Sequence, residues 1–260
     1  MPLRGELVTL LRRARIPVVI AALTAMSFPA VTNGQWLNLP SADIPRTADG
    51  KPNLTAPAPR LPDGKPDLSG IWLRSRNYMD GIDPPFQSWA DTLFKQRVAD
   101  SGKDDPIGRC LPWGIPRIGA FSVQKIIQQP RLIVVLYESL TTFRQIFMDG
   151  RKLPEDPNPT WMGYSVGRWD GDTLVVETGG FNGKTWLEVR GHPLTDALHV
   201  TERMRRRDVG HMEVRVTIDD PKAYTRAWDT TIQLDLLPDT ELLEYVCNEN
   251  EKDAVHLVGK

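Results

Sequence analysis

The amino-acid sequence predicts a mainly β protein, an antiparallel up-and-down barrel of about 8–9 strands, and three observations lead to this fold. From residue 121 onward the chain alternates apolar and polar residues or forms short apolar runs, which is the pattern of β-strands. Most runs are separated by short turns such as Asp149-Gly150, and short turns force neighbouring strands to run antiparallel. Closing such a meander removes the exposed edges that an open sheet would leave; a β-sandwich is the alternative.

Length and composition fit one globular domain with extensions. The chain has 260 residues, of which 40% are hydrophobic and 25% are charged, and these are ordinary values for a globular domain. Its 32 basic and 33 acidic residues give a net charge of -1. A balanced charge creates no field that would attract nucleic acid or an anionic membrane, so neither partner is indicated.

Residues 1–34 have the pattern of a secretory signal peptide. Arg12, Arg13 and Arg15 precede an apolar run over 16–25 that is too short to span a bilayer, and small and polar residues follow up to Gly34. We therefore expect a periplasmic or secreted protein with no membrane contact after cleavage. A retained membrane anchor is the alternative.

Residues 35–70 form a Pro-rich arm that we expect to lie on the domain surface. The arm contains a short internal repeat, Asp-Gly-Lys-Pro-Asn-Leu at 49–54 and Asp-Gly-Lys-Pro-Asp-Leu at 63–68. Two copies of six residues are too small to build a repeat architecture, so we interpret both as turns.

Residues 71–120 are expected to supply a strand, a helix and a Cys-containing loop that pack on the barrel. The strand is predicted over 71–73. The helix is predicted over 86–100, where Trp89, Leu93, Phe94 and Val98 fall on one face. Prolines and a glycine between 110 and 117 exclude both a helix and a central strand there.

Cys110 and Cys247 are the two cysteines of the chain. Behind a signal peptide they would reach an oxidising compartment, where they can form a disulfide bond; two separate buried thiols are the alternative. A bridge would join the front of the mature chain to its last predicted strand.

The barrel domain is predicted over 121–260. Strands are expected over 121–128, 131–138, 142–148, 163–169, 173–178, 199–207, 211–219, 224–236 and 241–248. Trp161, Trp169, Trp186 and Trp228 lie in this region, and they either pack in the core or line an interior.

The Asp-Gly pair at 170–171 predicts a tight hairpin. A two-residue loop at these positions favours a type I′ turn and pairs Tyr164 with Glu177 and Arg168 with Thr173. Tyr164, Arg168 and Glu177 then share a face. If that face lines the interior, it offers a phenol, a guanidinium and a carboxylate to a polar ligand; if it lies outside, it is an ordinary solvated surface.

A second hairpin directs Glu202 toward the interior. Asp208-Val209-Gly210 has the composition of a three-residue loop with the glycine in the left-handed conformation, and it pairs Glu202 with Val216. Glu202 then lies among apolar residues of both strands. Because an unpaired buried carboxylate is costly, either a structural ion pair or a catalytic acid/base role would explain it.

The four histidines, at 192, 199, 211 and 256, show no metal-binding spacing and have no cysteine partners, so no metal is predicted. His192, in a loop beside the predicted barrel mouth, is the best candidate for proton transfer, because imidazole titrates near neutral pH. An exposed loop histidine without a role is the alternative. Nucleotide-binding and nucleophilic-serine motifs are absent from the sequence, and we expect no cofactor.

Five sequence blocks resemble a widespread family of secreted bacterial proteins. They are PDLSGIW at 66–72, PTWMGYSVGRWDGDTLVVET at 159–178, LHVTERMRR at 198–206, TIDDPKAYTRAWDTTI at 217–232 and LLEYVCNEN at 242–250. The resemblance covers nearly the whole mature chain. It implies secretion and a single domain, and it brings no particular reaction.

The predicted barrel is similar to lipocalin-like folds, among which phenolic acid decarboxylases and cyclases act on an apolar or aromatic acid through Tyr, Arg and Glu. This similarity is one of fold alone. It favours a cofactor-free acid/base enzyme, a decarboxylase-like lyase or an isomerase, on a small aromatic or partly apolar molecule bound inside the barrel. The candidate catalytic residues are Glu202, His192, Tyr164, Arg168 and Glu177.

A non-catalytic small-molecule binding protein is the alternative, and a surface interaction module with a solid core is a third interpretation. The sequence does not determine the oligomeric state.

Overall fold

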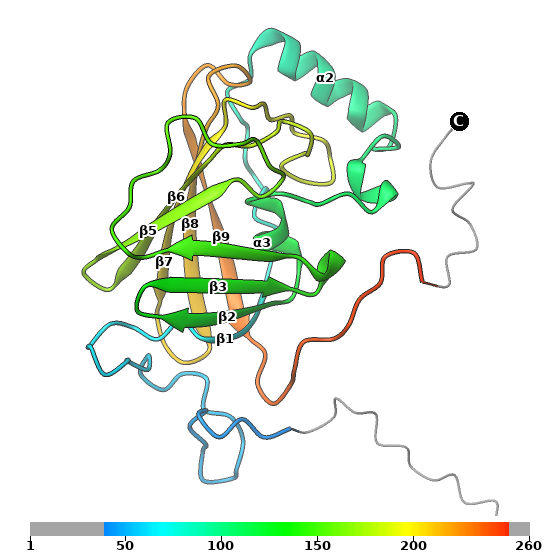
Figure 1. Ribbon diagram of the computed structural model, residues 1–260. Coiled ribbons are helices and arrows are strands. Elements are labelled where there is room, and N and C mark those ends of the chain that lie inside the picture. Colours follow the sequence, from blue (N-terminus) through cyan, green and yellow to red (C-terminus); the bar gives the residue numbers. More distant parts are fainter. Residues whose placement is uncertain (1–38, 250–260) are drawn as a thin grey trace, which may run out of the picture. The chain divides into compact units, whose positions relative to one another are not determined.

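The computed structural model describes residues 39–249, which form a closed barrel of nine strands (Figure 1). The predicted signal peptide lies outside the described residues. The strands are β1 (Gly70–Arg74), β2 (Gln124–Gln129), β3 (Leu132–Tyr137), β4 (Phe143–Phe147), β5 (Tyr164–Asp170), β6 (Thr173–Gly179), β7 (His199–Arg206), β8 (His211–Asp219) and β9 (Trp228–Leu236). The helical elements are α2 (Ser88–Ala99), η1 (Pro106–Arg109), α3 (Arg117–Phe121) and η2 (Ser139–Thr141). The predicted mainly β barrel is confirmed, and α2 is the one substantial helix of the described chain, as expected.

One neighbouring strand pair is parallel. The strands follow one another around the barrel in chain order, and β9 pairs with β1 to close it. An odd number of strands cannot alternate in direction all the way around a closed ring, so at least one pair must be parallel. That pair is β4 and β5, where Ile146 lies opposite Ser165. The long connection over 148–163 permits it, because parallel neighbours need a crossover of about a dozen residues or more.

Two segments differ from the prediction in whether they belong to the barrel. β1, which was expected to pack outside the barrel, pairs with both β2 and β9 and so belongs to it. The strand predicted over 241–248 is wrong, because the described tail after β9 runs from 237 to 249 without strand structure. The alternating residues of the tail have no free sheet edge to join, since β1 already occupies the edge of β9.

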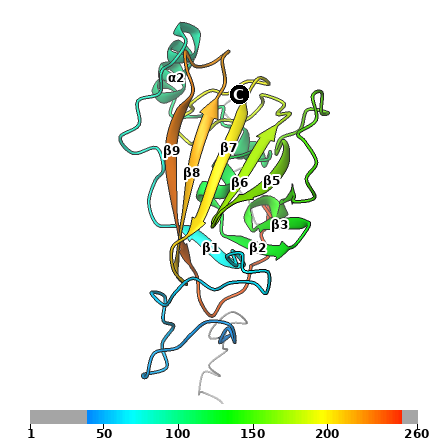
Figure 2. The same ribbon diagram turned by 90° about the vertical axis from the view of Figure 1, so that its left-hand side faces the viewer.

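The predicted pairing of β7 with β8 is confirmed, and Figure 2 shows these two strands beside β9. Glu202 lies opposite Val216, and Val200 lies opposite Ile218. The residues on the inner face are buried, whereas Arg203 and Arg205 on the outer face are exposed. Gly210, predicted to be left-handed, does not have a positive φ. Its small size serves a different purpose, because the backbone of Leu54 in the arm lies directly against it.

The register predicted for the Asp-Gly hairpin is wrong by two residues. Asp170 pairs with Thr173, so the loop is Gly171-Asp172 and Tyr164 lies opposite Gly179. Gly171 has a φ of +58°, whereas Asp172 is not among the residues with positive φ. A glycine at the first loop position alone fits a type II′ turn better than the predicted type I′ turn.

The face predicted for helix α2 is also partly wrong. Trp89 and Val98 are each 46% exposed, and the buried residue of the helix is Ala90. Phe94 stacks on Phe86, with ring centroids 5.3 Å apart. The helix therefore rests on connecting loops rather than on the barrel wall.

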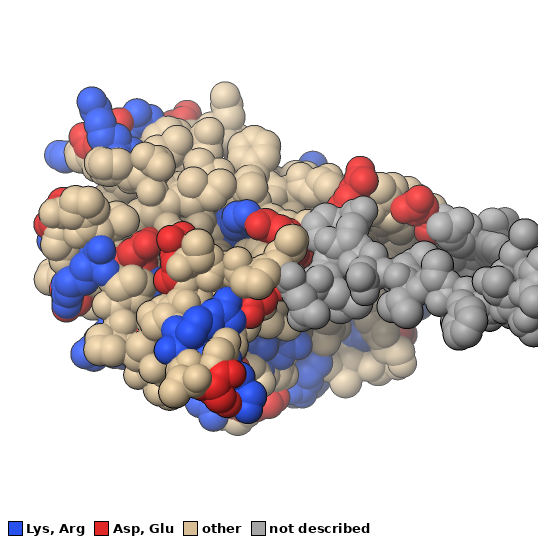
Figure 3. Space-filling view, turned by 90° about the horizontal axis from the view of Figure 1, so that it is seen from below, with Lys and Arg blue, Asp and Glu red and all other residues tan. Residues whose placement is uncertain are grey.

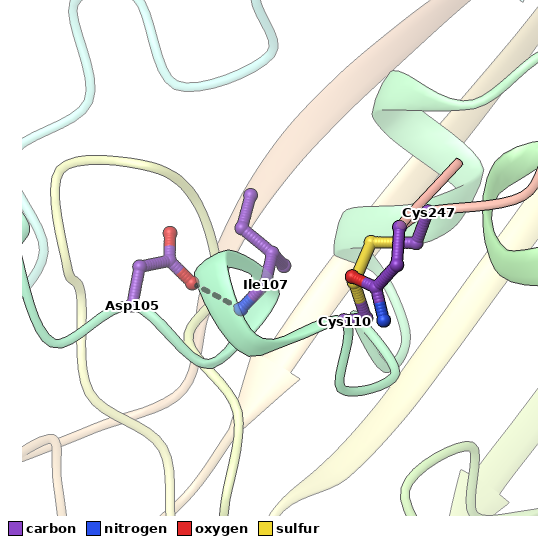
Figure 4. The surroundings of a disulfide bond; sticks show 5 residues. Asp105, Ile107, Cys110 and Cys247 are labelled. Carbon is purple, nitrogen blue, oxygen red and sulfur yellow. Dashed lines mark hydrogen bonds between the residues drawn. A yellow bond between two sulfur atoms is a disulfide. The ribbon is translucent and has the colours of Figure 1, made fainter. Parts of the chain in front are cut away.

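The predicted disulfide bond between Cys110 and Cys247 is confirmed (Figure 4). The two Cα atoms are 5.9 Å apart, and the cysteines are separated by 137 residues in the sequence. Cys110 follows η1, whose first turn is capped by the Asp105 carboxylate, which accepts a hydrogen bond from the Ile107 N–H at 3.2 Å. Cys247 lies in the tail, so the bridge fastens the tail to the loop after η1.

The arm crosses the end of the barrel that is at the bottom of Figure 1. The carbonyl groups of Leu54 and Ala56 accept hydrogen bonds from the N–H groups of Gly210 and Val209, at 2.7 and 2.9 Å. Both predicted turns are present, and Gly50 and Gly64 hold φ values of +82° and +81°. Between residues 39 and 249, no helix is both long and apolar enough to cross a membrane.

Candidate functional site

Glu202 points into the barrel and is 6% exposed. Its Oε2 atom accepts a hydrogen bond from Nη2 of Arg144 at 2.5 Å, and Arg144 is 5% exposed. The structure thus supplies the buried partner that a structural ion pair requires. Arg144 had not been singled out from the sequence, although its alternation with Ile146 in β4 places both on one face.

Arg144 joins four neighbouring strands through hydrogen bonds. Its Nε donates to Oγ of Ser165 at 3.0 Å, and its Nη2 donates to Oγ1 of Thr178 at 2.7 Å. The two hydroxyl groups lie 3.0 Å apart. Burial alone would lower the pKa of Arg144, but the Glu202 carboxylate and the Tyr137 hydroxyl group together outweigh this effect and the pKa is raised. Arg144 therefore stays charged, and its charge is compensated inside the barrel.

Tyr137 completes a group of polar side chains beside the ion pair. It is fully buried, and burial is the main reason why its pKa rises to about 12. The barrel interior therefore combines a phenol, a guanidinium and a carboxylate. These residue types were predicted for the Asp-Gly hairpin of β5 and β6, but all three come from other strands, β3, β4 and β7.

The space beside this group is small. A cavity of about 20 Å³ is lined by Tyr137, Arg144 and Glu202 together with apolar side chains. A buried water needs roughly 10–15 Å³ of such space, so the cavity has room for about one water molecule. Gln124 and Gly119 line it too, and Nε2 of Gln124 donates to the Gly119 carbonyl group of α3 at 2.9 Å. The rest of the interior is filled by core side chains.

His192 is buried rather than exposed. It is 1% exposed, and its Nδ1 lies 2.5 Å from Oε1 of Glu188, which is equally buried. The imidazole packs against the tilted Phe94 ring and stacks on the Phe86 ring, with centroid distances of 4.2 and 5.6 Å. Burial raises the pKa of Glu188, but the hydrogen bond with His192 and the backbone N–H of Arg190 outweigh it, and the pKa is lowered. Sequence reasoning missed Glu188, although its spacing of four residues from His192 was visible.

Tyr164, Arg168 and Glu177 lie on the outside of the barrel. Nη1 of Arg168 donates to Oε1 of Glu177 at 2.7 Å, and the Arg168 side chain is 62% exposed. The Tyr164 hydroxyl group accepts a hydrogen bond from Arg151 at 2.9 Å. The pair of Glu177 with Arg168 is diagonal across the two strands, as the corrected register requires. These three residues and the two buried candidates, Glu202 and His192, therefore do not form one site.

A larger pocket lies at the end of the barrel where the arm crosses it. We name it the arm pocket; its volume is about 500 Å³. Its walls come from the arm between 41 and 69, from β1 and β2, and from the chain between 236 and 241. Apolar side chains such as Ile44, Ile71 and Ile127 alternate with polar ones such as Gln128. The sequence had no signal for this pocket, because four segments distant in the chain build it, namely 41–71, 125–129, 206–209 and 236–241.

Arg206 is the buried cation of the arm pocket. Its guanidinium donates to the carbonyl groups of Asp67, Ser69, Asp208 and Val209, and it stacks on the Trp72 ring at 4.8 Å. Burial lowers its pKa to about 10. None of the salt bridges found among residues 39–249 includes Arg206, and the hydrogen bonds of its guanidinium go to backbone carbonyl groups.

The tryptophans of the barrel region pack mainly in the core. Trp186 and Trp228 are buried, while Trp161 and Trp169 are partly buried. The described part of the chain contains no group of three or more His, Cys, Asp or Glu side chains that could hold a metal ion.

Comparison with protein-family models and with curated proteins finds no match to this chain. The resemblance of the five sequence blocks to secreted bacterial proteins therefore stays a prediction, and the function has to be argued from the arm pocket and the barrel interior.

Proposed function

We propose that the protein binds a small, partly apolar molecule in the arm pocket, in the periplasm or outside the cell. One observation carries the proposal. The arm pocket has a volume of about 500 Å³, within the range of about 300–1,000 Å³ that is typical of small-molecule sites. The barrel interior offers room for one water.

The lining supports a ligand with both apolar and polar groups. Apolar contacts come from Ile44, Ile71 and Ile127, and the buried guanidinium of Arg206 gives the pocket a fixed positive charge. Lys125 at the rim is neutralised by Glu241, with 2.7 Å between nitrogen and oxygen. Figure 3, which looks onto this end of the barrel, shows basic and acidic residues side by side rather than a field of one sign. Steering by a strong electrostatic field is therefore not part of the proposal.

The disulfide bond supports the proposed location. Stable disulfides form in oxidising compartments such as the periplasm and the extracellular space, and are rare in the cytosol. The Cys110–Cys247 bridge fits such a compartment. The proposal requires no cofactor, no metal and no second protein.

Binding is tested with two matched variants. Gln129 and Gln145 are both exposed glutamines on the outside of the barrel, and only Gln129 lines the arm pocket. Ligand-observed NMR with benzoate, p-coumarate and their neutral amides first establishes a binder. We expect Gln129→Trp to weaken binding at least tenfold by filling the pocket, and Gln145→Trp to leave it unchanged. Equal affinities in both variants, or no binding to the unmodified protein, would overturn the proposal.

A second candidate function is acid/base catalysis, a lyase or isomerase reaction with Glu202 as the proton-transfer group. It is favoured by the grouping of Tyr137, Arg144 and Glu202 beside one cavity. A substrate the size of an aromatic acid would have to displace the packing of α3 to enter, because the cavity has room for about one water.

The catalytic candidate predicts a specific effect of Glu202→Gln. If Glu202 transfers a proton, turnover of p-coumarate should fall by roughly 100-fold to 10,000-fold. The same variant leaves the Arg144 charge without a carboxylate, so the free energy of unfolding should fall by about 3–5 kcal/mol whether or not catalysis occurs. Ser165→Ala is the control, because it removes the two hydrogen bonds of the Ser165 hydroxyl group from the same network and keeps the carboxylate. A variant with unaltered turnover would end the catalytic candidate, and unaltered stability would contradict the ion pair.

A further inference from the structure

The arm consists of two units that fold alike. Residues 45–54 and 59–68 share the pattern Pro-Arg, then Asp-Gly-Lys-Pro, then Leu at the end. In the first unit Thr47 N–H donates to the Lys51 carbonyl group at 2.9 Å, and in the second Leu61 N–H donates to the Lys65 carbonyl group at 2.9 Å. The sequence repeat is therefore a structural repeat as well.

Each unit uses its arginine to hold the barrel or its tail. Arg46 of the first unit makes a two-point ion pair with Asp239. The distance from Nη1 of Arg46 to Oδ2 of Asp239 is 2.8 Å. Arg60 of the second unit makes a two-point ion pair with Asp172, at 2.9 and 2.6 Å. All four side chains are accessible to solvent.

The second unit has further attachments deep in the barrel. Its final residue, Leu68, is fully buried. Gln128 accepts a hydrogen bond from Leu68 N–H and donates one to the Pro66 carbonyl group. The Asp67 carbonyl group accepts from Arg206. The second unit is thus fixed independently of its ion pair.

The start of the arm, from Ser41 to Arg46, is attached at the pocket rim by solvent-accessible polar contacts, and Ile44 alone among these residues packs against the hydrophobic core. Ser41 N–H donates to Oδ1 of Asp239 at 2.9 Å, and Asp239 N–H donates to Oγ of Ser41 at 3.3 Å. Together with the Arg46 ion pair these contacts join the arm to the tail; we name this group the clasp. Ser41 and Ile44 line the arm pocket from one side, and Thr240, next to Asp239, lines it from the other. Surface ion pairs contribute little to stability, so a contact of this kind can open thermally.

We propose that the clasp is the gate of the arm pocket: the start of the arm, residues 41–53, swings away from Asp239 to admit a ligand, while the second unit stays attached as the fixed wall. The inference rests on the proposed function, since it describes the regulation of the same pocket. Leu54 marks the end of the moving part, because its carbonyl group is held by Gly210.

The equivalent arginines give a matched test. Arg46→Gln removes the ion pair of the clasp, and Arg60→Gln removes the corresponding ion pair of the fixed unit. Hydrogen exchange followed by mass spectrometry reports the motion without any ligand. We expect Arg46→Gln to speed exchange over 41–53 at least threefold and to leave 59–70 unchanged. Arg60→Gln should leave 41–53 unchanged and alter 59–70 by less than twofold, because the buried Leu68 keeps that unit in place.

Stopped-flow binding of the fluorescent probe 8-anilinonaphthalene-1-sulfonate gives the second readout. Arg46→Gln should raise its association rate constant at least threefold, and Arg60→Gln should not. Unaltered exchange over 41–53 in Arg46→Gln, or equal responses of the two variants, would overturn the gate. Failure of the probe to bind the unmodified protein, with the expected exchange pattern, would refute the proposed ligand site and leave the motion of the first unit standing.

Discussion

At the scale of single residues, the inward direction of Glu202 follows from sequence pattern, but the identity of its partner does not. Alternation in β7 and β8 fixes the face on which Glu202 lies. Arg144 reaches it from β4, and β5 and β6 lie between the two strands in the barrel. Which inward residues meet across a barrel depends on the stagger of all intervening strands. The predicted register of β5 with β6, two of the intervening strands, was wrong by two residues. The sequence therefore could not show that Arg144 and Glu202 meet.

Glu188 and His192 make a prediction about pH at the same scale. The pKa of Glu188 is lowered in the folded protein. As pH falls, the unfolded chain takes up the proton first, near the ordinary value of 4.5. The stabilisation by the pair is therefore present above that pH and is lost as the pH falls through the lower pKa of the folded state.

We expect Glu188→Gln to reduce the free energy of unfolding at pH 7 by about 1–3 kcal/mol, because a charged hydrogen bond in a buried site is lost. The difference from the unmodified protein should shrink at about pH 3.5. Urea unfolding at both pH values measures it. Glu155→Gln, at an exposed position in the β4–β5 connection, is the control and should have no effect at either pH. A difference that stays constant with pH would contradict the stabilisation of the Glu188 carboxylate.

At the scale of elements, the positions of strands follow from the sequence better than the details of their turns. β8 was predicted with its observed bounds, because an unbroken alternation from His211 to Asp219 is bounded by Gly210 and Pro221. The loop at Gly210 was assigned to the right place for the wrong reason. Glycine was expected for its positive φ, whereas the arm requires it for close approach. A contact made by a segment far away in the sequence cannot be seen in a local turn pattern.

The contact at Gly210 gives a prediction for the arm. A Cβ atom at this position would lie 2.5 Å from the Leu54 Cβ and 2.9 Å from the Leu54 carbonyl oxygen. Gly210→Ala should therefore push the arm off the β7–β8 loop and reduce the free energy of unfolding by about 1–3 kcal/mol. The amides of Val209 and Gly210, which donate to the arm, should exchange faster with solvent.

Hydrogen exchange by NMR measures these two amides directly. Gly108→Ala is the matched control, because an added Cβ there meets no atom within 4 Å. If both variants leave the two amides equally protected, the arm does not depend on close approach at Gly210.

At the scale of the whole molecule, closure is the property that local patterns describe least well. The strand expected in the tail is absent from the described barrel, and the short run around Ile71 takes the closing position between β9 and β2. Both segments were predicted as strands, so the local pattern of neither one tells which of them closes the barrel. The same ring geometry makes β4 and β5 parallel, a consequence of nine strands that no single segment contains.

The disulfide bond makes the last prediction at this scale. Cys110 and Cys247 are 137 residues apart, and strands β2 to β9 all lie between them. A bridge that closes so long a loop restricts the unfolded chain strongly, and the chain-entropy estimate is about 4–5 kcal/mol of stabilisation. The combined variant Cys110→Ser and Cys247→Ser should therefore lose about that much free energy of unfolding in urea. The unmodified protein with its disulfide reduced should unfold at the same urea concentration as the variant. In unreduced, denatured protein, Cys110 and Cys247 should resist alkylation because both sulfur atoms are in the disulfide bond. If the variant and the oxidised protein unfold at the same urea concentration, the tail is held by other contacts and the bridge does not stabilise the barrel.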